Sequence, residues 1–304
     1  MGAWSESITG NDTAQDLRSE YQVAFYYYND VDTALRKIND YVRNVGIDES
    51  DESEWCDYYY SLADFMWSKG ILTDAVKNET VRLIDSGFGL EIWEDAGKKT
   101  LEKRKKVLKA FRDKIMSPQP PKKKISMGLH KKLFEIGDII ILQIQTADKT
   151  YTGRQKNVSE ETLKKADGKY VAIRKIADIK NRLSAIEPAA CNYYPIFQLY
   201  NKLFNMPPEL ENVINLDCAK FPLDGVRNSN HDGLFCGYGG MLYFKKRKYA
   251  VIGNYQKDIK TFSQKYRFDG QNPPCEIETF FFGINHEYYN VDEALLNGIS
   301  CFDS

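Results

Sequence analysis

Apolar side chains recur at helical spacing through the first hundred residues. Within residues 31–45 an apolar residue returns every three or four positions, which places these residues on one face of a helix. Residues 55–66 repeat large aromatic and aliphatic side chains at the same spacing, and residues 72–84 contain a shorter series. We therefore expect three helices here. Their apolar positions are Val31, Leu35, Ile38, Val42 and Val45, then Trp55, Tyr58, Tyr59, Leu62, Phe65 and Met66, then Leu72, Val76, Leu83 and Ile84.

Capping residues mark the ends of these helices. Asp30 is a candidate N-cap, Gly70 follows one helix as a C′ glycine does, and Ser86-Gly87 ends the next. Near the start of the chain, Asn11 or Asp12 is expected to cap an earlier helix. Asp12 and Asp16 are also four residues apart, a spacing at which two carboxylates could bind a cation.

A basic helix is expected over residues 98–115, with Leu101, Leu108, Phe111 and Ile115 on one face. The run Ser117-Pro118-Gln119-Pro120-Pro121 ends it, because proline lacks the N–H donor and clashes with the preceding turn. Three lysines follow. We therefore divide the chain into an acidic helical domain (1–117) that ends in this helix, a Pro/Lys linker (118–124) and a β-rich domain (125–304).

Strand-like patterns dominate beyond the linker. We expect a buried strand over 136–145, a second over 169–176 and a late strand over 277–284. Residues 241–244 and 249–252 resemble a hairpin around the charged tip Lys245–Lys248. The predicted fold is α+β: a helical domain followed by a mostly antiparallel β-barrel or curved sheet. Short helices are expected over 160–166, 255–265 and 291–296.

Charge is distributed unevenly along the chain. Residues 1–97 hold 20 Asp and Glu against 7 Lys and Arg, a net charge of −13, whereas residues 98–132 hold 14 basic against 2 acidic residues, a net charge of +12. Such asymmetry steers charged partners. The basic helix is expected either to neutralise the acidic domain or to bind nucleic acid through its lysines, although no base-reading motif accompanies it.

Residues suited to catalysis or metal binding are sparse. None of the six cysteines lies within four residues of another, so the zinc and redox pairs with that spacing are absent. We expect no bound metal or cofactor. The glycines of 236–240 precede a strand-like run, which favours a turn over a phosphate loop. An enzyme would need a site assembled by folding, and Cys236, His231 and His286 are the candidates for it.

The segment Asp48–Glu54 contains no apolar residue and is expected to form a solvated loop beside aromatic side chains. A charged rim next to aromatic anchors is typical of protein interfaces. The predicted partner-binding residues are Asp48, Glu49, Asp51, Glu52, Glu54, Trp55, Tyr58 and Tyr59. The N-terminus lacks the pattern of a signal peptide and no apolar run is long enough to cross a bilayer, so we expect a cytoplasmic protein without a membrane partner.

The opening Met1-Gly2-Ala3-Trp4, followed by Asn11-Asp12-Thr13-Ala14-Gln15-Asp16, resembles a bacterial family of unknown function whose members begin in this way. The resemblance covers about the first 20 residues closely. The sequence departs from the family pattern at Ser5, where glycine is usual, and at Leu17, where tryptophan is common. The family has no established catalytic residues, so the resemblance implies none for this chain.

The run Phe134–Gln143, with Gly137-Asp138 before a β-branched stretch, is similar to a strand of SH3-like barrel immunity proteins from bacterial polymorphic-toxin systems. Residues 169–176 and 248–253 would be later strands of that barrel. The resemblance implies a protein that neutralises a toxin or nuclease by binding it, of a kind also common in prophages. Our hypothesis is therefore a non-enzymatic interaction protein, an immunity protein or a phage-linked inhibitor of a bacterial defence complex. The sequence leaves open the partner, the oligomeric state and the strand order.

Overall fold

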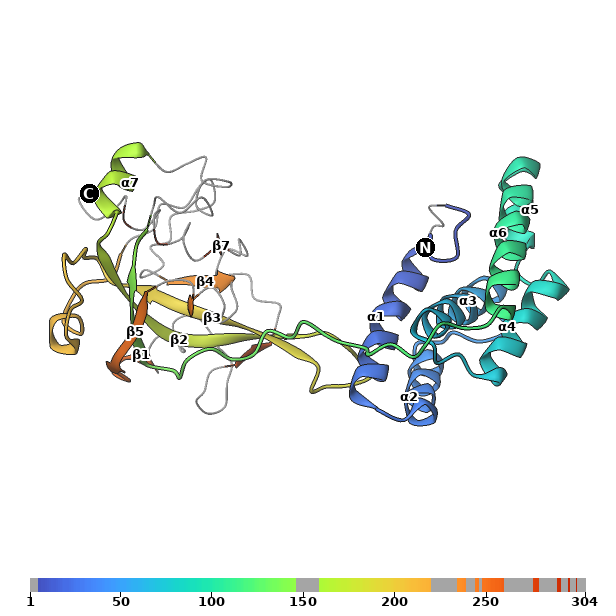
Figure 1. Ribbon diagram of the computed structural model, residues 1–304, viewed down its shortest axis with the longest axis horizontal. Coiled ribbons are helices and arrows are strands. Elements are labelled where there is room, and N and C mark those ends of the chain that lie inside the picture. Colours follow the sequence, from blue (N-terminus) through green and yellow to red (C-terminus); the bar gives the residue numbers. More distant parts are fainter. Residues whose placement is uncertain are drawn as a thin grey trace. The chain divides into compact units, whose positions relative to one another are not determined.

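The computed structural model describes residues 5–145, 159–219, 234–238, 244–245, 248–259, 276–278 and 289–290, together with Leu295 and Ile299. The chain divides into two compact units. The helical unit comprises Met1–Gly128 and Leu183–Ala190, and the sheet unit comprises Leu129–Arg182 and Cys191–Ser304. Helices come first and strands follow, so the fold is α+β, as the sequence predicts (Figure 1).

A capping side chain precedes each of the longer helices of the helical unit except α6, which follows Gly97 and has no side-chain cap. Asn11, Asp30, Asp51 and Thr73 each accept a hydrogen bond from a backbone N–H in the first turn of the helix that follows. Asp51 corrects the predicted loop, because the last three residues of Asp48–Glu54 already belong to a helix. The helices are α1 (Asp12–Tyr27), α2 (Val31–Asn44), α3 (Glu52–Lys69), α4 (Asp74–Ser86), α5 (Glu91–Asp95) and α6 (Lys98–Met116).

Aromatic and aliphatic side chains fill the core of the helical unit. Tyr21 of α1, Leu62 and Met66 of α3, Leu83 of α4 and Phe111 of α6 are buried in one cluster. Each such side chain stabilises the fold by about 1.5–3 kcal/mol when it leaves water. Most of the apolar positions read from the sequence therefore lie in or against this core, whereas Val45 is 50% exposed.

The predicted linker lies against the helical unit. Gln119 accepts a hydrogen bond from the Leu72 N–H at 2.8 Å and donates one to the Leu72 carbonyl at 3.2 Å. The Lys123 N–H donates to the Lys69 carbonyl at 2.9 Å. The division between units accordingly falls after Gly128, whereas the sequence placed the end of the linker at residue 124.

The sheet unit is built on strands β1 (Asp138–Gln143), β2 (Tyr170–Arg182), β3 (Cys191–Leu199), β4 (Leu234–Tyr238) and β5 (Tyr249–Asn254). They run in the order β5-β1-β2-β3-β4 with antiparallel neighbours, and Ile140 of β1 lies opposite Ile173 of β2. The short β6 (Glu276–Glu278) pairs in parallel with β2, and β7 (Tyr289–Asn290) does so with β4. In the described residues the path is open rather than closed into a barrel.

Both faces of β1 are covered. Ile140 and Leu142 pack into one apolar cluster with Val171, whereas Ile139 and Ile141 pack into another. Successive side chains of a strand point to opposite faces of a sheet. A strand covered on both sides is apolar at consecutive positions, which is why Ile139–Leu142 do not alternate with polar residues.

Several predictions for the sheet unit change. The segment 249–252 pairs with β1. Of its predicted hairpin partner 241–244, Phe244 is helical and residues 241–243 lie outside the described residues. The sequence also missed β3, because Pro195 lacks the N–H that a strand donates. The predicted helix 160–166 is α7 (Glu160–Ala166). In the predicted helix 255–265, Tyr255–Asp258 are not helical and residues 260–265 lie outside the described residues. So do residues 279–284 of the predicted strand 277–284 and all of the predicted helix 291–296 except Leu295.

Candidate functional site

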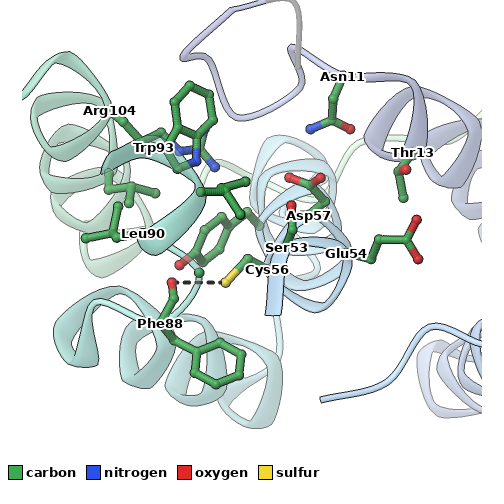
Figure 2. Close-up of a pocket in the computed structure, with 14 residues that line it drawn as sticks. Asn11, Thr13, Ser53, Glu54, Cys56, Asp57, Phe88, Leu90, Trp93 and Arg104 are labelled. Carbon is green, nitrogen blue, oxygen red and sulfur yellow. Dashed lines mark hydrogen bonds between the residues drawn. The ribbon is translucent and has the colours of Figure 1, made fainter. Parts of the chain in front are cut away.

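The helical unit contains a small pocket between its helices. Residues from the start of α1, the first two turns of α3, the α4–α5 connection, α5 and α6 surround it, and its volume is about 80 Å³ (Figure 2). Polar and apolar side chains share the lining: Asn11, Thr13, Ser53, Glu54, Cys56, Asp57, Tyr60, Phe88, Leu90, Ile92, Trp93, Arg104 and Leu108, with the backbone of Gly89.

Arg104 is the cationic group of the pocket and is only 3% exposed. It lies on the buried face of α6, four residues before Leu108, so packing of the helix carries the guanidinium inside. Its Nη1 donates to the carbonyls of Glu6 and Ser7 at 3.0 and 2.9 Å. The guanidinium stacks over the Trp93 ring at 4.9 Å, and its Nε has no hydrogen-bond partner in the described residues. Burial lowers the Arg104 pKa.

Asp57 of α3 is the anionic group on the other side. Figure 2 shows its carboxylate near Asn11, with Arg104 and Trp93 across the pocket. Burial raises the pKa of Asp57 to about 6, although the charge of Arg104 and a hydrogen bond from Asn11 act in the opposite direction. Asp57 is therefore a carboxylate held at a considerable cost in free energy.

Cys56 and Tyr60 lie beside this pair of charges but are not activated. The Cys56 thiol donates to the Phe88 carbonyl at 3.3 Å (Figure 2), and burial raises its pKa to about 11. A protonated thiol is a poor nucleophile. Burial likewise raises the Tyr60 pKa well above its usual value. The pocket thus holds the Arg104 guanidinium and the carboxylates of Asp57 and Glu54, and neither Cys56 nor Tyr60 is activated as a nucleophile.

The acidic residues predicted to bind a partner are fixed by local bonds. Asp48 accepts a hydrogen bond from the Ser50 N–H at 2.8 Å, and Asp51 accepts one from the Glu54 N–H at 3.0 Å. Glu52 accepts a hydrogen bond from the Gly89 N–H at 2.9 Å, and Glu49 forms an ion pair with Arg82 at 3.0 Å. Glu54 lines the pocket. The first four carboxylates remain exposed while serving as caps or pairs.

The predicted aromatic anchors differ in exposure. Trp55 and Tyr59 are half-buried, and their rings meet edge to face at 5.1 Å. Tyr58 is only 2% exposed, and its hydroxyl donates to the Asn39 side chain. Tyr58 is therefore a core residue that supports the other two rings from beneath.

The basic helix divides its charges between two roles. Lys103, Arg112 and Lys114 pair with Glu6, Asp85 and Asp64 at 3.2, 2.7 and 2.6 Å, which neutralises part of the acidic domain. Five further lysines of α6 are exposed and lie on its flank and on the face away from its buried residues, and one of them, Lys105, lies 3.9 Å from Glu102. They are Lys98, Lys99, Lys105, Lys106 and Lys109.

The structure does not test the alternative hypothesis of a catalytic site formed by Cys236, His231 and His286. His231 and His286 lie outside the described residues, and of Cys236 only the backbone, in β4, is described. Within the described ranges, no three His, Cys, Asp or Glu side chains gather as a metal site would require.

Of the two residues predicted to cap the first helix, Asn11 is the one that caps α1. Among the helices described, none combines the length and the apolar character needed to cross a bilayer.

Sequence reasoning missed the pocket, although a signal was available. Arg104 interrupts the apolar stripe of α6 between Leu101 and Leu108. A charged residue on a buried face is costly unless it is paired or hydrogen-bonded, so such a residue indicates a polar site. Asp57 likewise interrupts an aromatic series on α3. Comparison of the chain with family models, curated proteins and solved structures found no match.

Proposed function

We propose that this protein is a non-enzymatic binding protein that recognises a basic protein partner through an acidic edge and thereby inhibits it. The acidic edge is defined by Asp48, Glu49, Asp51, Glu52, Trp55 and Tyr59. The observation that carries the proposal is four exposed carboxylates at the start of α3, next to two half-buried aromatic rings. Interfaces place aromatic anchors inside a polar rim in this way.

Preorganisation of the edge supports the proposal. Asp48 and Asp51 are held by backbone N–H groups, and Glu49 is held by Arg82. These bonds fix the side chains before a partner arrives, so binding orders fewer rotamers. An exposed cluster of one sign also raises the rate at which an oppositely charged partner associates.

Inhibition is the part of the proposal that comes from the sequence resemblance to immunity proteins. A basic surface on a toxin or nuclease is the surface with which it contacts nucleic acid, so an acidic edge that covers it would block that contact. Such a protein would act in the cytoplasm.

The test is a variant in which the carboxylates become amides: Asp48→Asn, Glu49→Gln, Asp51→Asn, Glu52→Gln and Glu54→Gln. Asparagine caps helices as well as aspartate does, and glutamine still accepts a hydrogen bond, so the fold is retained. Partners cross-linked to the wild-type protein in cells would be identified and purified. We expect the variant to associate with that partner at least ten-fold more slowly at low salt, with a weaker dependence on salt.

A matched control removes the same charge elsewhere in the helical unit, at the exposed residues Asp16, Asp32, Asp40, Asp74 and Asp95. It should retain most of the association rate. Equal loss in both variants would assign the effect to net charge alone. An unchanged rate in the acidic-edge variant would refute the proposed surface.

Nucleic-acid binding through α6 is the second candidate, and the exposed lysine face favours it. Replacement of Lys98, Lys99, Lys105, Lys106 and Lys109 by glutamine should then abolish binding to a duplex oligonucleotide. The slope of log K against log salt for the wild type should reflect the phosphates contacted, about −0.9 per phosphate. Wild-type protein that fails to bind the duplex at 50 mM salt would exclude this candidate.

A further inference from the structure

The charged groups of the pocket, Asp57 and Arg104, face a shared space without bonding to each other. Arg104 directs its printed hydrogen bonds to backbone carbonyls of Glu6 and Ser7, and among the described residues no ion pair joins it to Asp57. Charge nevertheless couples the two groups, since each affects the pKa of the other. The pocket thus presents a carboxylate on one side and a guanidinium on the other.

Arg104 is almost fully removed from bulk water and its Nε has no hydrogen-bond partner in the described residues, and Asp57 is partly buried. A buried ion costs several kcal/mol unless a counter-charge and hydrogen bonds replace its hydration. A ligand with an ammonium at one end and a carboxylate at the other would supply a charged hydrogen bond to each group.

The size of the pocket limits such a ligand. A volume of 80 Å³ corresponds to about five to eight water-sized positions, which is the scale of a small organic zwitterion. Leu90, Ile92 and Leu108 add apolar lining that can contact a short aliphatic side chain. A long or aromatic side chain would exceed the space.

We propose that the pocket binds a small α-amino acid as its zwitterion, with the ammonium on Asp57 and the carboxylate on the guanidinium of Arg104. A simple anion is disfavoured by the adjacent Asp57 and Glu54 carboxylates. A simple cation is disfavoured by Arg104. The zwitterion satisfies both ends, and its recognition does not depend on the acidic edge or on the proposed function.

The test is isothermal titration of the full chain with glycine, L-alanine and L-serine at pH 7.5. Three probes share parts of the alanine structure: alaninamide lacks the carboxylate, N-acetylalanine lacks the ammonium, and acetate is the anion alone. We expect at least one of the amino acids to bind and all three probes to bind ten-fold more weakly or not at all. These comparisons need no variant protein.

Two variants locate the site. Asp57→Asn should weaken amino-acid binding at least ten-fold, because Figure 2 shows its carboxylate facing the space between Asn11 and Arg104. Asp16→Asn removes an exposed carboxylate that does not line the pocket, so it should leave binding nearly unchanged. The amide-substituted acidic edge with Glu54 left intact should also bind the amino acid normally. The proposal is overturned if none of the amino acids binds with a dissociation constant below about 10 mM, which corresponds to a binding free energy of about −2.7 kcal/mol. It is also overturned if alaninamide or acetate binds as well as alanine. A third contradicting result would be an Asp57→Asn variant that binds the amino acid as well as the wild type does.

Discussion

The two units bury opposite charges in different ways. In the sheet unit Lys175 and Asp178 are each 1% exposed, and Lys175 Nζ donates to the Asp178 carboxylate at 2.8 Å and to the carbonyls of Leu133 and Phe134 at 2.6 and 2.8 Å. All three ammonium protons are thereby satisfied. In the helical unit, Asp57 and Arg104 line a pocket and share no such bond.

This difference separates a structural charge from a charge available to a ligand. A closed pair such as Lys175 with Asp178 leaves no donor for another molecule, so it contributes to packing and to the choice of one conformation. An open pair keeps hydrogen-bonding capacity that a ligand can use.

Lys175→Met should have the largest effect on stability. The substitution leaves the Asp178 carboxylate buried without its counter-charge, which costs about 3–5 kcal/mol. Denaturant unfolding followed by circular dichroism would measure the loss. Lys131→Met, at an exposed lysine of the same unit, is the control and should change stability by less than about 0.5 kcal/mol.

The double variant Lys175→Met/Asp178→Leu sharpens this result, because an apolar pair of similar volume often replaces a buried ion pair without loss. It should recover most of the stability lost by the single variant. A single variant as stable as the wild type would show that the closed pair is not a structural requirement.

Glu20 is a buried single charge that is satisfied by the loop Leu183–Ala190. Its carboxylate accepts a hydrogen bond from the Ser184 hydroxyl. It also accepts hydrogen bonds from the Ala185 N–H at 2.9 Å and the Ile186 N–H at 3.3 Å. Glu20→Ala should cost about 2 kcal/mol, as expected for hydrogen bonds to a charged group. Limited proteolysis should then cut within 183–190.

The exposed Asp16 lies on the same helix, and Asp16→Asn provides the control for Glu20. Protection of 183–190 should be unchanged in that variant. Equal protection in Glu20→Ala would mean that the carboxylate does not hold the loop.

Asp57 should make stability fall as pH rises. Its pKa is about 6 in the folded protein and about 3.9 in an unfolded chain, so the folded state retains the proton to higher pH. The cost of ionisation appears between about pH 4 and pH 6 and is complete above that range. Asp57→Asn should therefore be more stable than the wild type at pH 7.5, by on the order of 2 kcal/mol, and equal to it near pH 4.

Denaturant unfolding of both proteins across pH 4–8 would measure the difference between them. Burial is the main cause of the raised Asp57 pKa, and the charges of Glu54 and Asp51 act in the same direction. Arg104 and Asn11 favour the charged form of Asp57 and so lower its pKa. A difference that does not vary with pH would show that Asp57 titrates normally and that the pocket does not desolvate it.

Asp51→Ala should have the smallest effect, because the carboxylate is exposed and acts as an N-cap. Its bond to the Glu54 N–H predicts a loss of about 1 kcal/mol. Asp51→Asn keeps the cap and should be neutral. A larger loss, of 3 kcal/mol or more, would place Asp51 with the buried charges rather than with the exposed ones.

The sequence by itself determined most of the long helices and several of their ends, although it missed the short α5 and placed the first residues of α3 in a loop. Asp30 caps α2, and Gly70 and Gly87 adopt the left-handed conformation after α3 and α4, as their positions predicted. These features depend on residues within about one turn of each other, so the information is local. The apolar stripe of α6 and the strand at 138–143 were predictable for the same reason, since their patterns repeat within a single element.

Only the tertiary structure decided which distant residues meet. A register shift between Lys175 and Ala177 lets Lys175 and Asp178 reach the same site, although residues three apart in a regular strand point to opposite faces. The return of Leu183–Ala190 to the helical unit has no local signature. The pocket likewise combines Asn11, Asp57 and Arg104 from three helices. Their juxtaposition follows from helix packing, which local spacing and capping do not specify.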